Sequence, residues 1–246
     1  MNDTKPSNMF YRRRGQPVSH PIPQRTAKWL VEEITRRNEK IRDFWSDHHG
    51  WAPPRAAEIL NRARLDRQVS LSKCLSIWLD SLPELAPQPR PYPWQTPGTQ
   101  VEDLGHSDGR LILAWANLGS LVEGTMKFGL SVFANEYDAT PVTRGKKKTP
   151  LDPDVLELEY LKQFYNQHFW IELQKPRCKQ EARWKQKTRW NKFVELVQKR
   201  RNAIHSYRDH DIGDWREFYV AVKNYLVLLS VIEGRMSYPD ELPTEY

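Results

Sequence analysis

The sequence GRLILAWANLGSLVEGTMKFGLSVFANEY, residues 109–137, is the most hydrophobic stretch of the chain. Its apolar residues lie nearly all round a 3.6-residue repeat, and this pattern predicts a buried central helix. Glu123 is the exception, because a carboxylate in such a helix must be paired, protonated or at the edge of an interface. An acid on one solvated stripe explains Glu123 equally well. The sequence therefore leaves open whether Glu123 is structural or functional.

Amphipathic patterns with helical spacing continue on both sides of this stretch, and no alternation typical of strands or Asn-Gly hairpin signal occurs. The sequence therefore predicts an all-α protein. The final helix is expected to begin at Asp214, whose side chain is a suitable N-cap. The other expected segments are helices over about 26–50, 52–63 and 70–82, a Pro-rich connection over 83–107, a lysine-rich surface loop over 138–152, a helix from Asp152-Pro153 to about 175, and a basic helix over about 177–207.

Changes in composition along the chain suggest its organisation. The Pro- and Arg-rich residues 1–24 predict an extended basic arm, which could contact nucleic acid but is as easily a solvated tail. Residues 25–108 form an N-terminal helical extension with the Pro-rich connection, residues 109–236 form the main helical domain, and residues 237–246 form a tail.

The composition narrows the class of protein. The chain has 246 residues with a formal net charge of +7, which favours an anionic partner without proving one. Cys74 and Cys178 lie far apart without a metal-ligand spacing, which excludes a disulfide framework and a CxxC zinc site and suggests reduced thiols in the cytoplasm. The N-terminus lacks the apolar core of a secretory signal, and no run of eighteen apolar residues predicts a membrane span.

The stretch QKRRNAIHSY, residues 198–207, gathers the groups that could carry chemistry. A histidine exchanges a proton near neutral pH, since its ordinary pKa is about 6.5. An arginine stays charged and grips phosphate oxygens in a bidentate manner. In an α-helix His205 would lie one turn after Arg201, on the same face. The candidate catalytic residues are Arg200, Arg201, Asn202, His205 and Tyr207.

These groups are what metal-free cleavage of RNA requires. A base removes the 2′-hydroxyl proton or an acid protonates the leaving 5′-oxygen, while a fixed cation stabilises the phosphate charge. One histidine does not readily serve as both the acid and the base, but a symmetric dimer would supply a second copy of it. The basic residues Lys185, Arg189, Lys192 and Lys199 are candidates for RNA binding. Arginine and histidine at a helix end also commonly satisfy the last carbonyls and the helix dipole, which is the structural alternative.

The run formed by Arg200, four residues, His205, one residue and Tyr207 resembles the R-x4-H-x-Y motif of HEPN-domain ribonucleases. It is most similar to the toxin of HEPN and minimal-nucleotidyltransferase toxin–antitoxin pairs, over about residues 109–235. The resemblance implies an antiparallel helical bundle and a dimeric, metal-independent endoribonuclease that leaves a 2′,3′-cyclic phosphate. It implies that Arg200 binds the phosphate, His205 is the acid or base, Asn202 orients one of them, and Tyr207 accepts nucleotides from an antitoxin.

One position departs from the family pattern. The family usually has Asn directly after the motif arginine, and here the arginine before Asn202 is Arg201, four residues before His205. Either Arg200 or Arg201 therefore fits as the functional residue. Two further interpretations stay open: a non-catalytic HEPN-like module that binds RNA, nucleotides or a protein, and an all-α protein whose basic helix contacts an acidic partner. The resemblance implies no cofactor, and it suggests a role in toxin–antitoxin systems or antiviral defence.

Overall fold

The computed structural model describes residues 24–47, 57–60, 64–79, 100–145, 147–169, 187–205 and 211–234. The predicted all-α class is confirmed, and a hairpin of two very short strands is the only β-structure in these ranges. Residues 57–60 are also helical. The elements are α1 (Gln24–Asp47), α3 (Leu65–Leu79), α4 (Gln100–Val132), α5 (Ala134–Ala139), β1 (Thr143–Arg144), β2 (Lys147–Lys148), α6 (Leu158–Phe164), the π-helix η3 (Tyr165–Phe169), α8 (Lys187–Arg201), the 3-10 helix η4 (Asn202–His205) and α9 (Trp215–Glu233).

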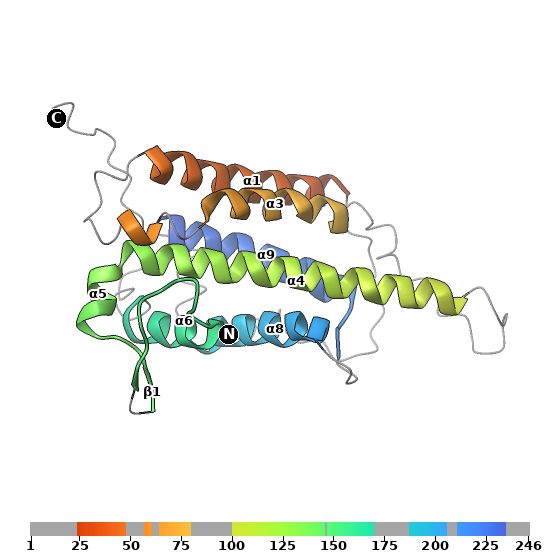
Figure 1. The fold of residues 1–246 in the computed structure, drawn as a ribbon. Coiled ribbons are helices and arrows are strands. Elements are labelled where there is room, and N and C mark those ends of the chain that lie inside the picture. The colour runs from red at the N-terminus through yellow and green to blue at the C-terminus, as the bar shows by residue number, and fades with distance from the viewer. Residues whose placement is uncertain are drawn as a thin grey trace, which may run out of the picture.

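Helix α4 runs through the middle of the bundle (Figure 1). Helices α1 and α3 pack together on one side of it, and α6 and α8 lie on the opposite side. Leu118, Leu121, Val122 and Met126 of α4 are completely buried, because the helix is surrounded. A single hydrophobic core includes side chains from α1, α3, α4, α6, α8 and α9. The apolar stretch that the sequence singled out is therefore the centre of the fold.

The bounds of α4 differ from the expected range of 109–137. The helix begins at Gln100, so the expected connection over 83–107 was wrong at its end. The reason is that the last proline of the connection is Pro97, after which nothing prevents the chain from continuing a helix. The helix ends at Val132, and α5 follows after one residue.

Two other helices begin at positions that the sequence did not predict. Helix α3 begins at Leu65 instead of Ser70. Helix α6 begins at Leu158, well after Asp152-Pro153. The side chains of Leu156 and Leu158 are both buried, and this i, i+2 spacing requires the extended backbone that residue 157 adopts. The core therefore delays the start of the helix.

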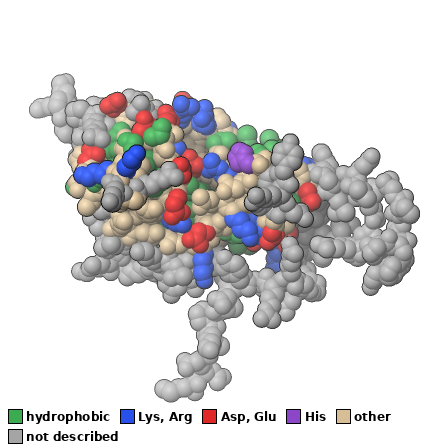
Figure 2. Space-filling view, turned by 60° about the horizontal axis from the view of Figure 1, so that its bottom comes forward, with side chains coloured by type: hydrophobic (Ala, Val, Ile, Leu, Met, Phe, Trp, Pro, Cys, Tyr) green, Lys and Arg blue, Asp and Glu red, His purple; other side chains and the backbone are tan. Residues whose placement is uncertain are grey.

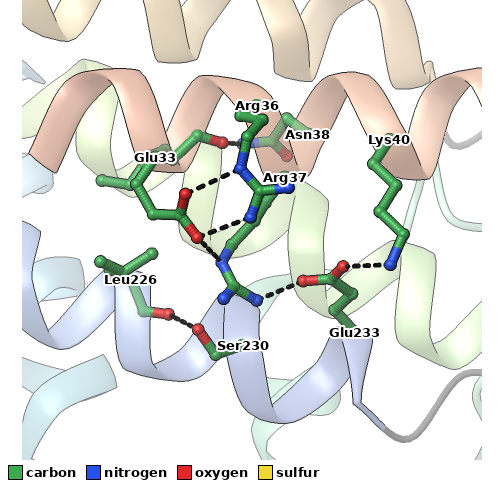
Figure 3. Close-up of polar contacts among 9 residues, drawn as sticks. Glu33, Arg36, Arg37, Asn38, Lys40, Leu226, Ser230 and Glu233 are labelled. Atoms are coloured by element: carbon green, nitrogen blue, oxygen red, sulfur yellow. Dashed lines mark hydrogen bonds and ion pairs between the residues drawn. The ribbon is translucent and has the colours of Figure 1, made fainter. Parts of the chain in front are cut away.

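An ion cluster ties the N-terminal helix to the last one (Figure 3). Glu233 is a buried carboxylate in the last turn of α9, where the helix dipole disfavours an anion. Arg37 of α1 donates to Glu233, and Lys40 Nζ lies 3.1 Å from the same carboxylate. Arg37 also pairs with Glu33 at 2.6 Å. The two cations offset the unfavourable position of Glu233 and join α1 to α9.

The terminal segments, and residues 177–186 and 206–207 of the expected basic helix, lie outside the described residues. The predicted arm over residues 1–24, of which Gln24 alone is described, and the tail over 237–246 stay predictions, as do the predicted domain bounds. The basic helix expected over 177–207 is described from Lys187, and its α-helical part ends at Arg201. None of the described helices is long and apolar enough to cross a membrane.

Candidate active site at the end of helix α8

The packing of α8 on α4 determines how the two arginines are oriented. Trp190, Phe193, Val194 and Val197 are buried, and their spacing marks one face of α8 turned toward the core. Arg200 follows at the next position on this face and is only 5% exposed. Arg201 is rotated by about 100° around the helix, and its side chain is 32% exposed. Adjacent residues of the same type therefore occupy different environments.

Arg200 joins the end of α8 to the start of α9. Its Nε and Nη2 lie 2.9 Å and 2.7 Å from Glu217 Oε2. Its Nη1 lies 3.0 Å from Asp211 Oδ1, without the alignment of a hydrogen bond. Gly213 has a φ of 73° and packs on this pair; a Cβ there would come within 3.2 Å of Arg200 Cζ and closer still to Glu217. Glycine is therefore required at this turn for two reasons.

The loop before α9 is held in place by two further contacts. Trp115 of α4 donates from Nε1 to the carbonyl oxygen of Ile212 at 2.9 Å. The side chain of Asp214 accepts a hydrogen bond from the backbone N–H of Glu217 at 2.7 Å, which confirms the predicted N-cap. Burial raises the pKa of Glu217; Arg200 opposes this rise, and the nearby Asp214 and Asp211 add to it. The pKa of Glu217 is therefore above its ordinary value despite the ion pair.

Arg201 lies along the surface of α4 instead of reaching α9. Its aliphatic stem crosses Gly119, where a Cβ would be 2.5 Å from Arg201 Cδ. Its Nη1 donates to Glu123, and Lys127 Nζ lies 2.8 Å from the other oxygen of that carboxylate. Gly119, Glu123 and Lys127 are spaced four residues apart, so they form one stripe along α4. This stripe receives and positions the Arg201 side chain.

The contacts of Glu123 explain why a carboxylate is tolerated in a hydrophobic helix. Burial raises the pKa of Glu123, but the hydrogen bonds from Arg201 and Lys127 outweigh burial and leave the pKa below its ordinary value. Glu123 is therefore ionised and paired, at the half-buried edge of α4. Its negative charge holds Arg201 by charge-assisted hydrogen bonding.

The change from α-helix to 3-10 helix at Asn202 alters the expected geometry of the motif. A 3-10 helix has three residues per turn, so residues i and i+3 lie above one another. Asn202 and His205 therefore share a side and are both exposed, while Ala203 is buried and Ile204 is 45% exposed. The expectation that Arg201 and His205 lie one α-helical turn apart was wrong, because the helix tightens between them.

The candidate RNA-binding residues lie in part on the outer face of α8. Lys192 and Lys199 are exposed and two helical turns apart, with the exposed Glu195 and Asn202 on the same side. Figure 2 shows a histidine at the surface with Lys or Arg side chains close to it. Lys185 and Tyr207 lie outside the described residues, and the side chain of Arg189 is not described.

Contributors to the site that were not among the predicted residues include Gly119, Lys127 and Glu217. Two of them carried a signal, since Gly119 and Lys127 lie four residues before and after Glu123 and so share its helix face. No sequence signal marked Glu217, because its contact with Arg200 depends on the path of the loop over 211–214 before α9.

The residues that the structure describes contain no group of three or more His, Cys, Asp or Glu side chains that could hold a metal ion. Comparison of the chain with protein families, with curated proteins and with solved structures finds no match.

Proposed function

We propose that the protein is a metal-independent endoribonuclease of HEPN type, with Arg201, Asn202 and His205 acting on one phosphodiester. The observation that carries the proposal is the position of Arg201. It is a partly exposed guanidinium, held against α4 by Glu123 and followed after one short turn by an exposed histidine. A positioned cation that precedes an imidazole by one short turn, with the imidazole able to give or accept a proton, suits phosphoryl chemistry.

The contacts favour Arg201 over Arg200 as the phosphate ligand. All three nitrogens of the buried Arg200 guanidinium lie within 3.0 Å of Glu217 or Asp211. Freeing them would leave two carboxylates without their cation. Arg201 uses Nη1 for Glu123, and no other hydrogen bond of its guanidinium joins it to a described residue. Its remaining N–H groups can therefore meet a phosphate, which also matches the usual family order of Arg followed by Asn.

The proposed reaction uses the substrate's own nucleophile. The 2′-hydroxyl oxygen attacks the adjacent phosphorus, and His205 or its copy removes the hydroxyl proton. The bond from phosphorus to the 5′-oxygen breaks, and a protonated imidazole gives the leaving oxygen a proton. The products are a 2′,3′-cyclic phosphate and a 5′-hydroxyl end. Arg201 stabilises the charge on the non-bridging oxygens, and Asn202, above His205 on the same side, orients the imidazole or the phosphate.

A homodimer is part of this proposal, since the motif supplies one histidine per copy and the reaction needs both an acid and a base. Two apolar side chains are open to solvent on the elements that adjoin the site. Leu113 of α4 is 50% exposed and Ile204 of η4 is 45% exposed, and α4 contacts η4. Burying these side chains against a second copy would remove apolar surface from water and bring two motifs together.

The proposed setting is the bacterial cytoplasm, in a toxin–antitoxin system or in antiviral defence. The resemblance of the motif supports this setting and suggests a nucleotidyltransferase-type antitoxin as regulator. Such a partner would modify Tyr207, two residues after His205 in the sequence.

The test is cleavage of labelled single-stranded RNA by the purified protein in excess EDTA, with His205→Ala and a Lys73→Ala control purified in parallel. Lys73 is a surface residue of α3, paired with Glu39 at 2.9 Å. We expect the parent and the control to cut equally and to leave cyclic phosphate ends, and His205→Ala to be inactive.

Equal cutting by all three proteins would mean a contaminant or another site and would overturn the proposal. Binding of RNA by all three without cutting, also at protein concentrations that drive dimerisation, would favour the non-catalytic RNA-binding module.

A further inference from the structure

We propose that the β1–β2 hairpin is a second binding site for the RNA backbone, distant from the site of cleavage. The inference rests on the proposed ribonuclease function and adds to it how the substrate is engaged. The ligand is the phosphodiester chain of a long RNA, contacted by Lys147 and Lys148.

The hairpin is a built feature rather than an irregular loop. Thr143 pairs with Lys148 and Arg144 with Lys147, and Gly145 turns the chain with a φ of 60°. Its base is anchored, because Val142 is buried and its carbonyl oxygen accepts from Thr149 N–H at 3.1 Å. The lysine-rich segment expected to be a solvated loop therefore contains a paired hairpin with an anchored base, and Figure 1 shows it projecting from the bundle.

Among the described residues, the lysines of the hairpin have no acidic partner. Lys147 and Lys148 are exposed and form no ion pair with any residue that the structure describes. No acidic residue lies between Asp138 and Asp152 in the sequence, while Arg144 and Lys146 add to the positive charge. On the α1 and α3 side, by contrast, lysines face acids, as in the pairs Lys28–Glu32 and Lys73–Glu39. The unbalanced charge makes the hairpin suitable for a polyanion.

A chain of contacts places the hairpin at the start of α8. Tyr137 of α5 donates to the carbonyl oxygen of Thr149 at 2.7 Å, and its ring packs against Phe164 with centroids 5.6 Å apart. Phe164 contacts Tyr165, whose ring lies 6.1 Å from that of Trp190, near the beginning of α8. His205 follows the opposite end of this helix.

The length of α8 gives the scale of the proposed binding path. A helix of 15 residues is about 22 Å long. Phosphates along one stacked strand are about 3.4 Å apart, so the two sites are separated by about six phosphates or more. Lys192 and Lys199 lie exposed between them on α8. A short RNA can reach one site only, and a long RNA can engage both.

The experiment measures binding in a His205→Ala background, so that it does not depend on cleavage. Fluorescence anisotropy would follow labelled single-stranded RNAs of about twenty and about four nucleotides across a salt series. The hairpin variant is K147Q/K148Q, and the matched control is K28Q/K73Q, which removes the same charge from the α1 and α3 side.

For the long RNA, we expect the plot of log K for binding against log salt concentration to have a less negative slope in K147Q/K148Q than in the parent. The expected difference is about 1.4, because each phosphate that a lysine no longer neutralises changes the slope by about 0.7. The control should leave that slope unchanged. In the cleaving protein, K147Q/K148Q should raise KM for the long RNA severalfold and leave kcat, and all cleavage of the short RNA, unchanged.

Equal slopes in hairpin and control variants would mean that net charge alone matters, and the proposal would fail. It would also fail if K147Q/K148Q left RNA binding intact but weakened binding to phosphatidylserine vesicles, since the hairpin would then be a membrane contact. If the ribonuclease proposal fails, the parent does not cut any RNA, whatever the slopes are.

Discussion

Arg200 and Arg201 differ by one position in the sequence and by almost everything in their surroundings. Arg200 is buried between α8 and α9, with Glu217 and Asp211 around its guanidinium. Arg201 lies half-exposed on α4, with one carboxylate holding it. Arg200 joins helix α8 to helix α9, and Arg201 is a partly exposed cation positioned on α4 by Glu123. The difference teaches that spacing in a motif does not by itself assign a role to an arginine, because neighbouring arginines can have different contacts.

The largest expected effect is on cleavage by Arg201→Ala. Loss of a cation that stabilises the phosphate charge should lower kcat about 10²- to 10³-fold. The free energy of unfolding should change by less than about 1 kcal/mol, because the ion pair with Glu123 is partly exposed. Single-turnover cleavage and urea unfolding would measure the two effects. Near-normal cleavage by this variant would remove Arg201 from the site.

Arg200→Ala should have the opposite profile. Removing the cation leaves the partly buried carboxylate of Glu217 without its ion pair, so we expect a loss of about 2–3 kcal/mol in the free energy of unfolding. Urea denaturation monitored by tryptophan fluorescence would measure it. Arg200→Lys, which keeps the charge but not the fork geometry, should recover part of the loss. Unchanged stability together with abolished cleavage would make Arg200 the functional arginine instead.

Gly119→Ala tests whether the position of Arg201 matters. The new methyl group would meet the stem of Arg201, with Cδ at 2.5 Å. The side chain must then shift, and we expect cleavage to fall about tenfold. Gly109→Ala is the matched control on the same helix, since nothing lies within 4 Å of its added Cβ. That control should cleave normally and gain about 0.5–1 kcal/mol of stability.

The smallest expected effects are opposite pH dependences of stability for the two carboxylates. Glu123 has a lowered pKa, so its contribution is present above the unfolded value of about 4.3 and is lost as pH falls through the folded value. Glu217 has a raised pKa, so its protonated form is favoured in the folded state, and stability falls as pH rises from about 4.3 through the folded value.

Glu123→Gln and Glu217→Gln, measured against the parent by urea unfolding between about pH 3 and pH 7, should therefore differ in sign. As pH rises, the parent should become more stable relative to Glu123→Gln and less stable relative to Glu217→Gln. Each change should be about 1 kcal/mol or less. The same sign for both variants would contradict the different environments assigned to the two arginines.

Several features could be predicted from the sequence because their signals are local. The apolar stretch after residue 109 predicted the central helix, and Asp214 before Trp215 predicted the cap of α9. The exposed positions of Lys192 and Lys199 follow from the helical repeat of α8, whose opposite face is apolar. Two positions in contact with Arg201 and Glu123 were also within reach, since Gly119 and Lys127 flank Glu123 at intervals of four residues.

By itself, then, the sequence determined the helical class, the central helix and the cap of α9, because periodicity and capping residues are properties of neighbouring residues. The site of chemistry in residues 198–207 stays a prediction from motif spacing. The tertiary structure alone decided which arginine is buried, that Glu123 is an ionised partner, and that His205 lies in a 3-10 turn beside Asn202. These outcomes depend on how α8 is rotated against α4 and on where the loop before α9 returns. Both are settled by packing between segments far apart in the chain, about which local pattern carries no information.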